Sequence, residues 1–137
     1  MRALVVDASV VLAWCFPDER SEFAYRILDL LEETPAVVPS LWFVEVANAV
    51  LVGERRKRLK SADAARFLKL LQSLMVETDS QTAGRALTDT LALARTWNLS
   101  AYDAAYLELA MREGLPLATL DDKLRTAARA AGVEVLR

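Results

Sequence analysis

Short apolar runs alternate with amphipathic stretches along this chain. Buried strands are predicted at residues 4–6, 36–38, 74–76, 115–119 and 133–136. Helices are predicted at residues 9–15, 18–33, 41–56, 79–97, 101–113 and 120–131, with a further helix capped by Ser61. Because the strands are too apolar to leave one face in water, the pattern favours an α/β fold, in which helices cover both faces of a mainly parallel sheet.

Composition narrows the chemistry that this fold can carry. The chain has 137 residues, is 54% hydrophobic and 26% charged, and has a formal net charge of -2. This length and apolar content predict a single packed domain over residues 1–137. The sequence has no histidine and only one cysteine, so a His-based triad, a His zinc site and a cysteine pair are all excluded. Catalysis would rest on carboxylates, hydroxyls, Lys or Arg, and carboxylate sites usually recruit Mg2+ or Mn2+.

The N-terminal segment and the apolar runs bear on localisation. Residues 1–7 lack the charged, apolar and small-residue order of a signal peptide. The apolar run at residues 41–52 is interrupted by Glu45 and Asn48 and falls short of the ~20 residues that span a bilayer. We therefore expect a cytoplasmic protein without a membrane segment.

Two acids follow predicted strands, where ligands bind in open parallel sheets. Asp7 lies between apolar neighbours, so its carboxylate must be hydrogen-bonded, neutralised or bound to a metal; capping of the next helix is an equal alternative. Asp121 follows the run at residues 115–119. The spacing of Thr119 and Asp122 matches a capping box, which gives Asp122 a local explanation and makes Asp121 the better functional candidate.

Two further acids interrupt apolar helices. Glu45 and Asn48 share one face of a helix that is apolar nearly all round and is expected to be largely buried. These two residues form either a small polar patch that belongs to a functional site or the only solvent-exposed stripe of the helix. Asp103 lies three residues after Ser100, and this capping-box spacing alone would justify an acid there. Clustered carboxylates raise one another's pKa, and a bound cation would relieve that cost.

The order of these motifs resembles the PIN domain, and specifically the VapC-type toxins of toxin-antitoxin pairs, over nearly the whole chain. The resemblance rests on Val5-Val6-Asp7-Ala8-Ser9, Pro39-Ser40-Leu41, Glu45-Val46-Ala47-Asn48, Ser100-Ala101-Tyr102-Asp103-Ala104-Ala105-Tyr106 and Thr119-Leu120-Asp121. It implies a PIN-like three-layer α/β/α domain and a Mg2+- or Mn2+-dependent endoribonuclease. The implied metal-binding and catalytic residues are Asp7, Glu45, Asp103 and Asp121, the supporting residues are Ser9, Asn48 and Thr119, and Asp122 could share the fourth position.

The resemblance also implies partners. These are an RNA substrate, a cognate VapB-type antitoxin that covers the acidic groove, and a second copy of the chain in a homodimer. A basic run just beyond the Glu45 helix is a candidate RNA contact or a solvated helix end, and it comprises Arg55, Arg56, Lys57, Arg58 and Lys60.

Two other functions compete with the nuclease. A receiver- or phosphatase-like phosphoryl-transfer domain also carries an acid after its first strand, but it needs a second acid where this chain has Ser9. A non-catalytic PIN-like module that binds RNA or protein would be expected to lose one or more of the acids. All four are present.

Overall fold

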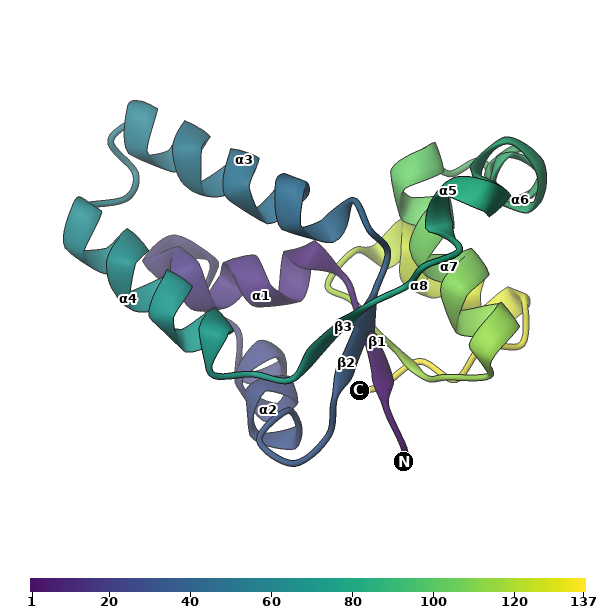
Figure 1. Cartoon of the computed structure of the whole chain (residues 1–137), viewed down its shortest axis with the longest axis horizontal. Helices are drawn as coiled ribbons and strands as arrows, with labels where there is room; N and C mark the ends of the chain where they lie inside the picture. The colour runs from purple at the N-terminus through teal and green to yellow at the C-terminus, as the bar shows by residue number, and fades with distance from the viewer.

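A four-stranded parallel sheet forms the centre of the molecule in the computed structural model, which describes residues 1–137 (Figure 1). Its strands are β1 (Leu4–Val6), β2 (Ala36–Val38), β3 (Val76–Thr78) and β4 (Leu117–Ala118), in the order β3-β2-β1-β4. All three neighbouring pairs are parallel, and a further parallel bridge joins Leu117 to Val135. The predicted mainly parallel sheet is therefore confirmed, and its named strands are parallel throughout.

Helices cover both sides of this sheet. They are α1 (Ala8–Cys15), α2 (Glu22–Leu30), α3 (Trp42–Arg55), α4 (Ser61–Gln72), α5 (Thr82–Arg85), α6 (Leu91–Trp97), α7 (Ala101–Glu113) and α8 (Asp122–Ala130), with a 3-10 turn, η1 (Pro17–Glu19), and a π-helical segment, η2 (Ala86–Thr90). In Figure 1, α1 to α4 lie on one side of the strands and α5 to α8 on the other. This arrangement confirms the predicted three-layer α/β/α class.

The core is centred on β1 and α7. The three β1 residues are at most 1% exposed, as expected for a parallel strand covered on both faces. Seven consecutive residues of α7, from 104 to 110, are buried, so this helix is enclosed on all sides over two turns. Asp7 directly follows β1 and Asp103 directly precedes the enclosed part of α7, so both candidate acids adjoin tightly packed segments.

Several predicted element boundaries were wrong. The helix expected at residues 18–33 begins only at Glu22, because Ser21 caps it with its hydroxyl and Pro17–Glu19 form a separate turn. Ser61 is the first residue of α4, and no side chain caps that helix. The third strand lies at 76–78 instead of 74–76, because its register pairs Val76 with Ala36. The last strand is reduced to the single bridge at Val135.

The long helix predicted at residues 79–97 is also modified. It consists of α5, η2 and α6, and the π-helical turn buries Thr90. One extra residue per turn rotates the side chains that follow, a change that apolar periodicity does not reveal. The helix ends where Asn98 adopts a left-handed conformation (φ 54°), a favoured helix stop.

Helix α3 is less buried than predicted. It packs on α1 through one face, which includes Trp42, Val46 and Val50. On its other side Phe43 and Val44 are 50% and 72% exposed. The expectation of a largely buried helix was wrong because α3 has no second helix covering this apolar face.

No helix in the structure combines the length and apolarity that crossing a membrane requires.

Candidate active site

Asp7 lies at the carboxyl end of β1 and is only 5% exposed. Its Oδ2 accepts hydrogen bonds from the hydroxyls of Thr119 (2.6 Å) and Ser9 (3.0 Å), and its Oδ1 accepts the backbone N–H of Ser9 (3.3 Å). Asp7 therefore caps α1 and also lies at the candidate site. Burial raises the pKa of Asp7, these hydrogen bonds oppose the rise, and the charge of Asp121 adds to it.

The two hydroxyls that hold Asp7 also join β1 to the turn after β4. Ser9 Oγ accepts the backbone N–H of Leu120 (3.1 Å), and Thr119 Oγ1 accepts that of Asp121 (3.0 Å). Each hydroxyl thus donates to Asp7 at the end of β1 and accepts a backbone N–H from the turn after β4. Ser9 and Thr119, two of the residues predicted to support the site, are thus in direct contact with Asp7.

Asp121, and not Asp122, caps the next helix. The Asp121 carboxylate accepts the N–H of Leu124 (2.8 Å). The predicted capping box of Thr119 and Asp122 is wrong, because the Thr119 hydroxyl is used by Asp7. The Asp122 side chain is 94% exposed and pairs with Arg125. Asp121 nevertheless acts electrostatically on both Asp7 and Asp103, so it is the acid that lies near the other candidates.

Glu45 reaches the site from the first turn of α3. Its Oε1 accepts a hydrogen bond from the hydroxyl of Tyr106 on α7 (2.7 Å). Burial raises the pKa of Glu45, the Tyr106 hydrogen bond opposes this, and the charges of Asp7 and Asp103 reinforce it. Sequence reasoning missed Tyr106. Its spacing of three residues from Asp103, on one face of the same helix, is the signal that could have found it.

Asp103 lies in the first turn of α7, where the Ser100 hydroxyl accepts the backbone N–H of Asp103 (3.1 Å). The reciprocal hydrogen bond, in which the Asp103 carboxylate would accept the backbone N–H of Ser100, is not formed, so the capping box is half complete. Burial raises the pKa of Asp103, and the charges of Asp7 and Asp121 add to the rise, while a hydrogen bond with the Ser100 side chain and the charge of Lys123 oppose it.

Other predicted residues lie outside this group. Asn48 is exposed, one turn beyond Glu45 on α3, and makes no side-chain hydrogen bond. The basic run follows the far end of α3, and Arg55 lies ten residues beyond Glu45, about 15 Å along the helix axis. Arg58 pairs with Asp18 and Glu19. The structure does not bring the basic run to the acids.

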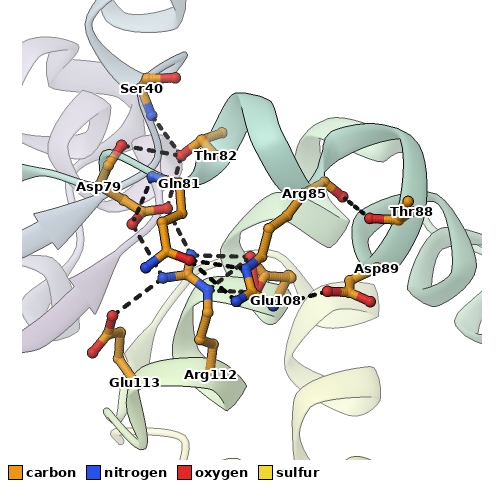
Figure 2. A network of polar contacts seen from close by, with 10 residues as sticks. All are labelled: Ser40, Asp79, Gln81, Thr82, Arg85, Thr88, Asp89, Glu108, Arg112 and Glu113. Carbon is orange, nitrogen blue, oxygen red and sulfur yellow. Dashed lines mark hydrogen bonds and ion pairs between the residues drawn. The ribbon is translucent and has the colours of Figure 1, made fainter.

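A second group of acids surrounds Arg112 of α7 (Figure 2). The guanidinium pairs with Asp79 (2.7 Å), Glu108 (2.9 Å) and Glu113 (3.1 Å), and the side chains of Arg112, Asp79 and Glu108 are 11%, 6% and 6% exposed. Burial alone would raise the pKa of Asp79, but the hydrogen bonds led by Arg112 outweigh burial and lower it. This group therefore contains its own cation.

The four candidate acids have no such cation. None of them forms an ion pair with Lys or Arg, and three of them have a raised pKa. As the side chains stand, no three acids converge closely enough to form a complete metal site. The donor set nevertheless fits a hard divalent cation in kind, since it consists of carboxylate oxygens that repel one another.

Comparison with known proteins defines the class of this fold and site. The PIN domain family matches residues 4–130 of the chain. The chain therefore belongs to the PIN domain family, and the receiver and phosphatase alternatives are set aside.

Among its relatives is ribonuclease VapC3 of Pyrobaculum aerophilum, 36% identical over 121 residues, which make up 88% of this chain and 91% of that protein. The crystal structure of PAE2754 from the same organism has a TM-score of 0.69 and 27% identity, over 97% of this chain and 90% of that one. VapBC2 of Rickettsia felis, bound to a promoter DNA fragment, has the same fold with a TM-score of 0.66 and 14% identity, over 98% of this chain and 97% of the other. The predicted resemblance to VapC-type PIN domains is confirmed.

Proposed function

We propose that this chain is a divalent-metal-dependent endoribonuclease and the toxin of a VapBC-type pair. Its class is supported by the PIN family match and by the 36% identity to a protein named as a ribonuclease. The observation that supports the metal dependence is the group of Asp7, Glu45, Asp103 and Asp121. Burial and mutual repulsion raise the pKa of three of these acids, and none of the four forms an ion pair with Lys or Arg.

The four acids would hold Mg2+ or Mn2+. Such an ion would polarise the scissile phosphate and lower the pKa of a bound water toward neutrality. Asp7 supplies the most rigid ligand, because Ser9 and Thr119 fix its Oδ2 and leave Oδ1 with one longer contact. Asp121 is held by its helix cap, while Glu45 and Asp103 approach from two helices. These carboxylates would supply the metal ligands without any histidine, of which the sequence has none.

We further propose a VapB-type antitoxin and a homodimer as protein partners. The exposed apolar face of α3, with Phe43 and Val44, supports a protein contact, because a contiguous apolar surface is costly to leave in water. RNA contact by residues 55–60, a single domain over residues 1–137 and a cytoplasmic location stay predictions.

The test is cleavage of labelled RNAs, including intact tRNA and rRNA, by the purified protein in Mg2+ or Mn2+. We expect cleavage that EDTA abolishes and that Asp7→Asn reduces by about 1,000-fold, the equivalent of about 4 kcal/mol of lost transition-state stabilisation. Asp122→Asn is the matched control, because its exposed side chain lies outside the acid group, and it should retain activity. Cleavage that persists in EDTA would contradict metal dependence. A folded protein that cuts none of these RNAs would favour the non-catalytic binding module.

A further inference from the structure

Glu45 and Tyr106 form the one side-chain hydrogen bond between α3 and the opposite helical layer. The tyrosine hydroxyl donates to Glu45 Oε1 at 2.7 Å across a sequence separation of 61 residues. Glu45 accepts no other hydrogen bond, and no other side chain of α3 is hydrogen-bonded. The orientation of this carboxylate therefore depends on a single donor.

The other end of the candidate site is held very differently. Asp7 accepts three hydrogen bonds, from Ser9 and Thr119, and Asp121 is fixed by the N–H of Leu124. These partners belong to the strand ends and to the first turn of a helix. Glu45 lies on a helix with an exposed apolar face, and only Tyr106 ties its carboxylate to the core.

Tyr106 is well suited to orient an acid that must keep its charge. Its side chain is 0% exposed within the enclosed part of α7, so the hydroxyl has a fixed position. A lysine or arginine in the same place would neutralise Glu45, as Arg112 neutralises Asp79. A phenol donates a hydrogen bond without adding a charge, and burial and the nearby acids raise the pKa of Tyr106, which keeps the proton in place.

We propose that Tyr106 is a positioning residue for the metal site: by binding Oε1 of Glu45, it leaves Oε2 as the oxygen that contacts a divalent cation. This inference rests on the proposed function. Hydrogen-bonding partners of metal ligands restrict ligand orientation, and their loss typically weakens metal binding 10- to 100-fold. Tyr106 thus couples the position of α7, which also carries Asp103, to the ligand on α3.

The test is calorimetric titration of the metal-free full-length protein with MnCl2. Tyr106→Phe removes the hydroxyl and keeps the ring, and we expect it to weaken Mn2+ binding by about 10-fold. Tyr102→Phe is the matched control on the same helix; Tyr102 is 64% exposed and should leave the affinity within about twofold. Thermal melts of the metal-free variants establish that each is folded.

Repeating the Tyr106→Phe substitution in a Glu45→Gln variant distinguishes a role in positioning Glu45 from a role in packing. In Glu45→Gln, where the charged ligand is already lost, adding Tyr106→Phe should change Mn2+ affinity by less than about twofold, since the tyrosine acts through Glu45. An equal loss in both backgrounds would identify a packing role and overturn the inference. Wild-type affinity in Tyr106→Phe would also overturn it while leaving the metal site intact. Failure of the wild type to bind Mn2+ would overturn the proposed metal dependence as well.

Discussion

The molecule contains two groups of partly or fully buried acids, and the pKa shift of Asp79 in one group is opposite in sign to those of Asp7, Glu45 and Asp103 in the other. Around Arg112, the guanidinium lowers the pKa of Asp79 despite burial (Figure 2). At the carboxyl end of the sheet, Asp7, Glu45 and Asp103 have no paired cation, and burial followed by mutual repulsion raises the pKa of each. The same residue type is therefore stabilised as an anion in one place and destabilised in the other.

This difference separates a structural cluster from the proposed metal site. The Arg112 group links α7 to the segment after β3, and each of its acids is paired with the Arg112 guanidinium. The acids of the other group have no ion-pair partner, and they lie at the position where parallel sheets bind ligands. Natural sequences carry such a cost where a cation or substrate compensates it, and this is the physical basis of the proposal that Asp7 and its neighbours bind a metal.

The largest effect on stability is expected from removing the ion pairs of the Arg112 group. Arg112→Gln removes the cation and leaves Asp79 and Glu108 buried without compensation, so unfolding free energy should fall by about 3–5 kcal/mol. Chemical denaturation measures this loss. Arg66→Gln provides the control, because its pair with Asp63 is exposed and should cost less than about 1 kcal/mol. Equal losses in the two variants would remove the contrast between the groups.

A metal ion should stabilise the folded protein by binding the acids around Asp7, and not by binding the Arg112 group. At 100 times its dissociation constant, Mn2+ should raise the unfolding free energy of the wild type by about 2.7 kcal/mol, because it binds the folded state. Asp7→Asn should lose this gain. The gain should persist in Asp79→Asn, whose altered acid belongs to the Arg112 group. Loss of the Mn2+ response in Asp79→Asn, with retention in Asp7→Asn, would reverse the assignment.

The smallest expected effect is on the pH dependence of the metal-free protein. Folded-state pKa values of Asp7, Glu45 and Asp103 lie above the usual 3.8, 4.5 and 3.8, so the folded state binds more protons than the unfolded state in the window above those values. Their contribution should make stability rise as pH falls from neutral toward about pH 5. Asp79, with a lowered pKa, weakens the fold only as pH drops below its usual 3.8.

Asp7→Asn removes one of the three raised groups, so its melting temperature should vary less over the same pH range. Thermal melts in EDTA at several pH values measure the two slopes. A wild type whose stability falls steadily on acidification from neutral pH, with the same slope in Asp7→Asn, would contradict the raised pKa values.

The fold was largely predictable from the sequence because apolar runs and helical periodicity report burial directly. The four acids were also identifiable, since each interrupts an apolar segment at a strand end or an early helical turn. Periodicity did not reveal the π-helical turn at Ala86–Thr90 or the exposed face of α3, because both depend on which elements pack together.

The partners of the acids were harder to predict. Thr119 matched a capping box with Asp122, but its hydroxyl binds Asp7, 112 residues away in the sequence. Tyr106 meets Glu45 across 61 residues, and Arg112 meets Asp79 across 33. Such contacts are set by the tertiary arrangement, so local spacing can nominate a residue but cannot identify its partner.

The central claim is that the unpaired acids bind a divalent cation, and a crystal grown with Mn2+ tests it most directly through anomalous scattering. We predict a peak in contact with carboxylate oxygens of Asp7 and at least one of Glu45, Asp103 and Asp121, with none at Arg112. A fully ordered structure that shows no peak among these acids at saturating Mn2+, or a peak at another cluster alone, would contradict the account.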